Sequence, residues 1–394
     1  MRSNLAQIVI EQDFLIMKTI KTFIKFIELI LSRKKSSPLY EEKFFVFIDN
    51  KFENYFDQIK VFFESGFLDK EKTILVAKFY RNNFFKVNKQ AKKIGLKTHF
   101  YLFYKQIPDI NGKVMLYPYN AQVNCRLILN RDASHIFLTH GESNKKASVN
   151  RMVRLYDHVL ASGDISCDRY LENKIFTESD LLDGRVIKVG STLSASCFEY
   201  LSAEGNNDAC IAYLPTWEGG NEEENFSSLA SPHITFFLRS LCEKMGASKI
   251  IIKPHPNTGG RVASYKRCFW ELINSLQQSG IEVYIDSDVE GFRKSTKKPY
   301  KDLSIKMGVC DVSASEFMLV AKKIPSIVVK NGEKKIFTTK RYMELRENAI
   351  VDIQNEKNID EFFINFFSQL NWKEITDEFY SYSFSKENFI FKEN

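Results

Sequence analysis

Short apolar runs, each followed by polar or turn-forming residues, alternate with segments of helical spacing along most of the chain. The runs are continuously apolar, which is typical of strands buried on both faces of a parallel sheet. Strands that alternate with helices predict an α/β fold with helices on both faces of the sheet. We expect strands at residues 44–48, 73–77, 98–103, 114–117, 136–139, 158–161, 185–189, 210–214, 249–253, 282–285, 303–309 and 326–329.

The length of the chain, 394 residues, favours two domains, since single domains commonly have about 100–200 residues. A stretch rich in Ser, Ala, Gly and Asn, residues 190–208, is the best candidate for the boundary. We therefore expect two Rossmann-like domains, over 41–195 and 205–355, that face one another across a central cleft. A helical segment over 356–394 follows them.

Residues 1–40 have the pattern of an amphipathic helix. Lys18, Lys21 and Lys25 lie three and four residues apart, so they share one side of a helix. They interrupt the apolar stretch too often for a transmembrane span, and no signal-peptide cleavage site follows it. Two interpretations remain open: a helix lying in the plane of an anionic membrane surface, and a helix packed on the protein's own core.

Charge and cysteine usage restrict the partners. The 56 basic and 49 acidic residues give a net charge of +7, a mild bias towards nucleotides, phosphates or anionic lipid, too small and dispersed to indicate nucleic acid binding. The seven cysteines form no CxxC pair, and none lies at metal-ligand spacing from a histidine. We expect reduced thiols in a cytoplasmic protein, with no metal and no cofactor.

His140 is the first candidate site residue. It follows the expected strand 136–139 and precedes Gly141 and a helix predicted over 146–156. Ligands in open α/β sheets bind at the carboxyl ends of the strands, and a helix start attracts anions. The alternative is a histidine with no role beyond filling the surface or core.

Three more turns follow strands of the second half. They are Pro215-Thr216-Trp217-Glu218, Lys253-Pro254-His255-Pro256 and Asp311-Val312-Ser313-Ala314-Ser315-Glu316. Because carboxyl ends of parallel strands share one edge, we expect these turns to converge. Each also has a structural interpretation: inter-domain packing for Trp217, a rigid proline turn around His255, and a helix cap in which Ser313 and Glu316 form a capping box.

Several common motifs are missing. The sequence contains no GxGxxG fingerprint, no GxxxxGK[ST] phosphate loop and no GxSxG elbow. Hydride transfer, nucleoside triphosphate hydrolysis and esterase-type acyl transfer are therefore disfavoured.

Taken in order, four motifs resemble the CDP-glycerol glycerophosphotransferase family, the teichoic acid primases and polymerases and their capsule-polymer relatives. They are the HG turn at 140–141, the YxPTW segment at 213–217, KPHP at 253–256, and the Asp-x-Ser-x-Ser turn at 311–315 with Ile324-Pro325 after it. The resemblance covers about residues 130 to 330. One departure is that Thr139 and Glu142-Ser143-Asn144-Lys145 replace the Trp and the Pro-Leu-Lys of the polymerases around the HG turn.

The resemblance implies a GT-B fold and a peripheral enzyme on the inner face of the bacterial cell membrane. Such an enzyme moves glycerol phosphate or ribitol phosphate from CDP-glycerol or CDP-ribitol to a hydroxyl of a lipid-linked or oligosaccharide acceptor, releasing CMP. His140 and His255 match the two histidines of the family, and Ser313 and Ser315 match its phosphate-binding hydroxyls.

We predict that His140 is the base, since the unperturbed pKa of histidine, about 6.5, suits an alcohol near neutral pH. Fixed donors must meet the charge that develops on the diphosphate. The residues expected at the donor are His255, Lys253, Thr216, Asp311, Ser313 and Ser315, and those expected at the acceptor are Ser143, Lys145 and Lys146.

Two other functions remain open. One is a GT-B glycosyltransferase that uses a nucleotide sugar, with the same two-domain cleft. The other is a non-catalytic capsule-assembly protein that retains the fold.

Overall fold

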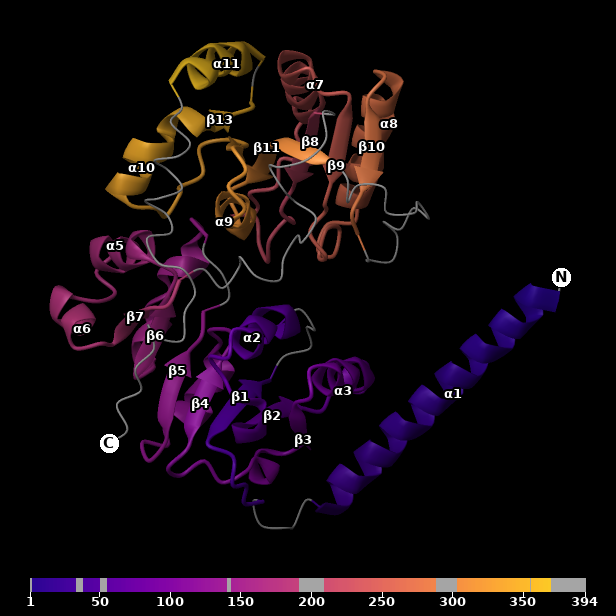
Figure 1. The fold of residues 1–394 in the computed structure, drawn as a ribbon, viewed down its shortest axis with the longest axis vertical. Helices are drawn as coiled ribbons and strands as arrows, with labels where there is room; N and C mark the ends of the chain where they lie inside the picture. Colours follow the sequence, from indigo (N-terminus) through magenta and orange to yellow (C-terminus); the bar gives the residue numbers. More distant parts are fainter. Residues whose placement is uncertain are drawn as a thin grey trace.

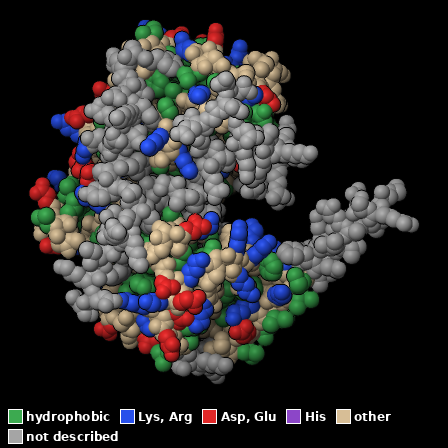
Figure 2. Space-filling model, viewed as in Figure 1, with side chains coloured by type: hydrophobic (Ala, Val, Ile, Leu, Met, Phe, Trp, Pro, Cys, Tyr) green, Lys and Arg blue, Asp and Glu red, His purple; other side chains and the backbone are tan. Residues whose placement is uncertain are grey.

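The computed structural model describes residues 2–32, 38–49, 55–139, 143–190, 209–287, 303–354 and 356–369. These residues form two α/β domains, each built on a parallel sheet (Figure 1). The two Rossmann-like α/β domains predicted from the alternating pattern, and the GT-B-like fold that the resemblance implies, are therefore confirmed. The molecule is hollowed on one side between the two domains (Figure 2).

The N-terminal domain contains a seven-stranded sheet of order β3-β2-β1-β4-β5-β6-β7, in which every pairing is parallel. Its strands are β1 (Phe44–Ile48), β2 (Thr73–Lys78), β3 (Lys97–Tyr101), β4 (Val114–Tyr117), β5 (Ser134–Phe137), β6 (His158–Ala161) and β7 (Val186–Lys188). Its helices are α1 (Arg2–Leu31), α2 (Tyr55–Glu64), α3 (Phe84–Lys93), α4 (Cys125–Ile128), α5 (Asp164–Glu172) and α6 (Glu178–Leu182).

The C-terminal domain contains a six-stranded sheet of order β10-β9-β8-β11-β12-β13, again with parallel pairings throughout. Its strands are β8 (Ala209–Leu214), β9 (Lys249–Ile252), β10 (Glu282–Ile285), β11 (Ser304–Asp311), β12 (Ser326–Lys330) and β13 (Ile350–Asp352). Its helices are α7 (Ile234–Met245), α8 (Ser264–Gln278), α9 (Ala314–Ala321), α10 (Lys340–Arg346) and α11 (Glu356–Gln369).

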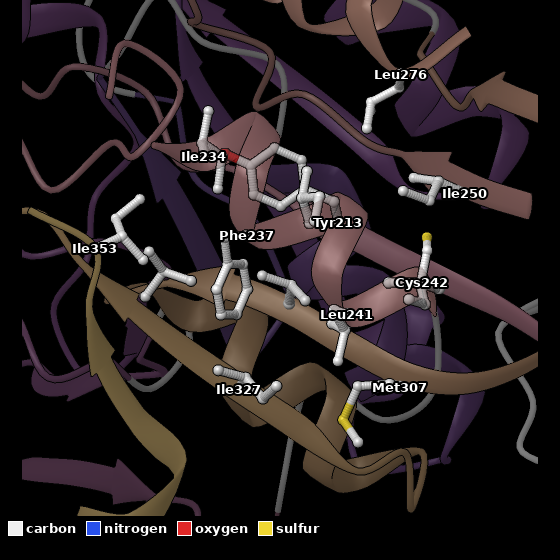
Figure 3. Close-up of a cluster of buried hydrophobic side chains, with 14 of the residues drawn as sticks. Tyr213, Ile234, Phe237, Leu241, Cys242, Ile250, Leu276, Met307, Ile327 and Ile353 are labelled. Carbon is white, nitrogen blue, oxygen red and sulfur yellow. The ribbon is translucent and has the colours of Figure 1, made fainter. Parts of the chain in front are cut away.

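One core cluster of the described residues packs against the C-terminal sheet (Figure 3). Phe237 and Leu241 of α7 pack there against Ile250 of β9 and Met307 of β11, and all four are at most 4% exposed. Burying a side chain of this size contributes about 1.5–3 kcal/mol. The described part of the C-terminal segment belongs to this core, because Phe363 of α11 stacks on Phe237 with ring centroids 5.3 Å apart.

The helix α1 combines features of both interpretations of residues 1–40. Thr22 and Leu29 are buried, and Phe26 stacks on Phe79 after β2. Other apolar side chains of α1 are exposed to solvent; they are Met17, Ile20, Phe23, Ile24, Ile27, Ile30 and Leu31. In Figure 1 the helix extends well beyond the sheet towards the N-terminus. None of the helices in the described ranges has the length and apolarity needed to cross a bilayer.

The prediction of a single helix over residues 146–156 is wrong. Two short 3-10 helices, Lys146–Val149 and Arg151–Leu155, occupy this stretch. Asn150 separates them because its backbone is extended, with φ −73° and ψ 116°, and its side chain accepts a hydrogen bond from the Met152 N–H. The anion-attracting α-helix start expected after His140 is therefore not present at this position.

The two domains contact one another through α5, α9 and α10. Ile165 of α5 packs in one buried cluster with Phe317 and Val320 of α9 and Tyr342 of α10. Polar contacts continue this interface, since the Glu172 carboxylate accepts a hydrogen bond from the Lys340 N–H at 3.1 Å. The two domains are therefore in direct contact at α5, α9 and α10.

Candidate active site

Three neighbouring strands of the C-terminal sheet end at the predicted site. The chain passes from β8 to Thr216, from β9 to His255 and from β11 to Ser313, and these strands lie side by side in the order β9-β8-β11. The strand order reverses between β8 and β11, where open α/β sheets bind their ligands. The expected convergence of the three turns is confirmed.

His255 stacks on Trp217, with ring centroids 5.9 Å apart and an angle of 19° between the planes. Its Nδ1 accepts a hydrogen bond from the Asn257 backbone N–H at 3.1 Å. A ring nitrogen that accepts must carry no proton, so the neutral ring carries its proton on Nε2. Burial, together with the Lys145 ammonium, lowers the pKa of His255 to about 4. At neutral pH His255 is thus an uncharged donor through Nε2–H.

Glu218 fixes the loop that carries His255. Its carboxylate is fully buried and accepts hydrogen bonds from the backbone N–H groups of Gly259, Arg261 and Val262 at 3.0, 2.8 and 2.9 Å. Burial alone would raise the pKa of Glu218, but these N–H groups outweigh it and hold the pKa below its usual value. The sequence placed Glu218 in a strand-end turn, but it gave no sign of this distant backbone partner.

Asp311 ties the turn after β8 to the end of β11. Its carboxylate is fully buried and accepts hydrogen bonds from the N–H groups of Thr216 at 2.7 Å and Ser228 at 3.1 Å. Burial raises the pKa of Asp311 to about 7, against the opposing effect of hydrogen bonds from Ser228 and Thr216 and of the Lys145 ammonium. The expected direct contact of Asp311 with a donor nucleotide does not fit this burial. Asp311 instead holds the backbone of Thr216 and Ser228 in place.

Ser313 is the N-cap of α9, and its Oγ accepts a hydrogen bond from the Ser315 N–H at 3.2 Å. The interpretation of Ser313 and Glu316 as a capping box is wrong. The Glu316 carboxylate turns into the core, where Arg346 Nε donates to it at 3.0 Å and the Tyr342 hydroxyl at 2.7 Å. The buried Arg346 guanidinium attracts this carboxylate more strongly than a backbone N–H at the helix start would. The Glu316 side chain therefore points away from the first turn of α9.

Lys145 reaches the C-terminal domain from the N-terminal domain. Its Nζ donates a hydrogen bond to Thr216 Oγ1 at 3.0 Å and lies 5.7 Å from the centre of the Phe226 ring. Burial lowers the pKa of Lys145 to about 8, although the carboxylates of Asp311 and Glu224 act in the opposite direction. Lys145, expected at the acceptor, thus stands among the residues expected at the donor. Thr216 is itself buried, so its hydroxyl meets Lys145 instead of solvent.

The structure also describes Lys253, Ser143 and Lys146, which were predicted at the site. The Lys253 ammonium donates a hydrogen bond to Asp286 Oδ2 at 2.5 Å. The positive charge that was expected to contact the diphosphate is therefore paired with a carboxylate. Ser143 pairs with Ser148 through their hydroxyls at 2.8 Å, and Lys146 is exposed. His140, Gly141 and Glu142 lie outside the described residues.

The backbone just before His140 is strained. Thr139 is buried and has φ 60°, in the left-handed region that β-branched residues rarely adopt. Such a conformation costs about 1–3 kcal/mol and is concentrated at functional sites. The strain therefore adds a physical reason to examine the position that follows the end of β5.

Comparison with solved structures identifies the architecture. The putative UDP-N-acetylglucosamine 2-epimerase of Listeria monocytogenes aligns over 88% of this chain and 92% of its own, with a TM-score of 0.51 and 9% identity. The chain has a GT-B-like fold. The UDP-GlcNAc 2-epimerase of Neisseria meningitidis, bound to UDP-GlcNAc, gives a TM-score of 0.49 at 12% identity over 87% of this chain and 95% of its own.

The wall teichoic acid polymerase TagF aligns over 93% of this chain and 97% of its own, at 15% identity and a TM-score of 0.44. No protein-family model and no curated protein sequence matches the chain. At these identities the likeness to solved structures concerns the fold alone. The chemistry of this GT-B-like protein depends on its own side chains.

Proposed function

We propose that this protein transfers glycerol phosphate or ribitol phosphate from a CDP-alditol to a hydroxyl of a lipid-linked or oligosaccharide acceptor, with release of CMP. The observation that carries the proposal is the neutral His255, whose Nδ1 accepts the Asn257 N–H and whose Nε2 therefore carries the proton, at a strand end of the same sheet edge as the start of α9. A neutral imidazole donor and the N-terminus of a helix suit the oxygens of a diphosphate. The order of the motifs around these residues supports the same class of donor.

In the proposed reaction, the acceptor oxygen attacks the β-phosphorus of the CDP-alditol. A bond forms between that oxygen and the β-phosphorus, and the bond from the β-phosphorus to the bridging oxygen breaks. The electron pair leaves with CMP, and the acceptor proton passes to a base. A group with a pKa of about 4 is a poor base at neutral pH, so we assign His255 to the diphosphate and keep His140 as the proposed base.

Lys145 supplies positive charge to this site from the other domain. It lies against Thr216, whose N–H is fixed by Asp311 at the point where the strand order reverses. A fixed cation at this point counters the charge that develops on the leaving CMP without moving during the reaction. We therefore assign Lys145 to the donor phosphates, together with Ser313 and Ser315, whereas the sequence placed it at the acceptor.

We also propose that α1 binds the inner surface of the cell membrane. Its exposed apolar side chains include Ile24 and Leu31, and Lys21 and Lys25 lie on the same helix. Apolar side chains that enter the headgroup region and lysines that attract anionic lipid are the two features of interfacial helices. The double variant I24E/L31E should lose most of its cosedimentation with anionic vesicles but keep its activity on a water-soluble acceptor.

The reaction is tested with a panel of donors. The purified protein receives CDP-glycerol, CDP-ribitol, UDP-GlcNAc and CDP-glucose in turn, with a lipid-linked disaccharide and an oligosaccharide as acceptors. We expect CMP release, dependent on the acceptor, from one or both CDP-alditols. Release of a nucleoside diphosphate from a sugar donor would favour the glycosyltransferase, and donor binding without turnover would favour a non-catalytic protein.

A further inference from the structure

A groove of about 1030 Å³ lies between α1 and the carboxyl end of β2, outside the candidate active site. Apolar side chains form both of its walls: Ile20, Phe23 and Phe26 from α1, and Phe79 and Leu102 from the sheet side. Pockets for drug-sized molecules are commonly about 300–1,000 Å³. The groove is thus large enough for a long hydrocarbon chain.

The helical wall of the groove is anchored at its C-terminal end. The Gln106 side-chain amide donates hydrogen bonds to the Leu29 carbonyl at 2.5 Å and to Ser32 Oγ at 2.9 Å. Phe26 stacks on Phe79 with ring centroids 6.1 Å apart. These contacts set the distance between α1 and the sheet where the groove begins.

The opposite wall is fixed by a buried carboxylate. Tyr80, which lines the groove, donates its hydroxyl to Asp49 Oδ1 at 2.8 Å. Tyr104 and Lys78 donate to the same carboxylate at 3.0 and 3.3 Å. Because Asp49 holds groups from β2 and from the segment after β3, the wall keeps its shape without a ligand.

Two cations stand at the edge of this apolar groove. Lys18 and Arg81 both line it, and neither forms an ion pair with another residue in the described ranges. Cationic side chains beside an apolar surface suit an amphiphile that has a hydrocarbon chain and an anionic head. The charge argues against a neutral lipid as the occupant.

The groove opens onto the exposed face of α1. Ile20 and Phe23 line the groove and are also 52% and 62% exposed, and the apolar surface continues from them to Ile24 and Ile27. A lipid that leaves a bilayer beneath α1 can therefore enter the groove without its chain crossing a polar surface.

We propose that this groove binds the hydrocarbon chain of the lipid-linked acceptor, and that Lys18 and Arg81 contact the phosphate that joins this lipid to its sugars. The proposal rests on the proposed function for the identity of the lipid. It gives α1 a second role, because the helix then holds an individual substrate molecule in addition to meeting the membrane surface.

The test uses the full chain and farnesyl monophosphate below its micelle concentration, with binding measured by isothermal titration calorimetry. Ile20 and Ile24 are a matched pair, one turn apart and 52% and 59% exposed, but only Ile20 lines the groove. We expect I20E to weaken binding at least tenfold and I24E to change it less than twofold. Equal effects of the two variants, or no binding by the wild-type protein, would overturn the proposal.

The phosphate contact has its own matched pair in Lys18 and Lys21. K18E should weaken binding of farnesyl monophosphate at least fivefold and leave binding of uncharged farnesol within twofold, whereas K21E should affect neither. Farnesol bound as tightly as the phosphate by the wild-type protein would overturn the assignment of Lys18 and Arg81.

These measurements are independent of turnover. If the wild-type protein releases no CMP but shows the difference between I20E and I24E, the proposed reaction fails and the lipid groove stands. If CMP is released and the two isoleucine variants behave alike, the groove fails and the reaction stands.

Discussion

The ammonium of Lys145 donates a hydrogen bond to the Thr216 hydroxyl at 3.0 Å, and so links a loop of the N-terminal domain to the turn after β8 in the C-terminal domain. Thr216 is buried and its N–H is held by Asp311, so this contact lies at the centre of the proposed donor site. The two domains therefore share the residues that would meet the donor phosphates.

The Lys145–Thr216 contact should be measurable as a coupling energy. K145M and T216V each remove one partner, and T216V keeps nearly the same side-chain shape. A double-mutant cycle on the affinity for a CDP-alditol should give a coupling of about 0.5–1.5 kcal/mol, the usual range for one hydrogen bond. Strictly additive effects would show that the two side chains do not cooperate in donor binding.

The same lysine predicts a pH dependence of donor binding. Its pKa is lowered to about 8, so Lys145 loses its charge as the pH rises through 8, whereas an ordinary lysine keeps its charge to above pH 10. We expect the KM for the CDP-alditol to increase between about pH 7.5 and 9 in the wild-type protein, and to be flat in K145M. A K145M profile that rises like the wild type would assign the titration to another group.

The titration of Lys145 should also change the stability of the fold with pH. Donor binding weakens as the pH rises, whereas the stability should increase. Its folded pKa lies below its unfolded value, so between about pH 8 and 10.5 the unfolded chain binds more protons. The contribution of Lys145 to stability therefore increases as the pH rises through this window. Thermal unfolding of wild type and K145M across pH 7–10 should show this difference, with the gain in the wild type only.

Replacing Glu218 should displace His255 without touching it. E218Q removes the charge that orients three backbone N–H groups of the loop, and about 1–3 kcal/mol of stability should be lost. We expect kcat to fall at least tenfold. The control is E222Q in the same turn: its carboxylate is exposed and pairs with Arg261 at the surface, so its effect on stability should stay within about 0.5 kcal/mol.

Glu218 also predicts acid sensitivity. Because its folded pKa lies below the usual value, its stabilising effect is complete above the unfolded pKa of about 4.5 and is lost as the pH falls through the folded value. The difference in stability between wild type and E218Q should shrink as the pH is lowered from 6 to 3.5. A constant difference would mean that the carboxylate is not the species that holds the loop.

The buried ion pair between Arg346 and Glu316 should be critical to the C-terminal domain. Their side chains are at most 1% exposed, and Arg346 Nε lies 3.0 Å from Glu316 Oε1. R346M leaves the buried carboxylate without its cationic partner, which should cost about 3–5 kcal/mol in chemical denaturation. The double variant E316Q/R346M should recover part of that loss, whereas K340A, at an exposed pair on α10, should have little effect.

The strands were predictable because side chains that are buried on both faces of a sheet are apolar, and this is visible in the sequence. Phe45, Val46 and Phe47 are fully buried on both faces of the sheet, so an unbroken apolar run was a sufficient signal. The convergence of the turns after such runs was also predictable, because parallel strands place their carboxyl ends at the same edge of the sheet. β13, at the edge of the C-terminal sheet, was not predicted.

Partners distant in sequence could not be predicted. Glu316 lies three residues after Ser313, which suggested a cap, but the Arg346 guanidinium that determines its orientation is 30 residues away. Asn144 is a similar case. It is almost fully buried, accepts a hydrogen bond from Arg169 at 3.1 Å and lies 3.5 Å from Glu316 across the domain contact. Local sequence could not reveal these two partners of Asn144.

In the proposed reaction His255 donates its Nε2–H to the donor diphosphate. The most direct measurement is the kcat for CMP release from the preferred CDP-alditol by wild type, H255A and H255Q. The control is H233A, at the histidine that precedes α7 and faces Glu356. We predict a loss of about 10²–10³-fold in H255A, partial recovery in H255Q because its amide also donates, and no change in H233A. An H255A protein that retains wild-type kcat would contradict the account.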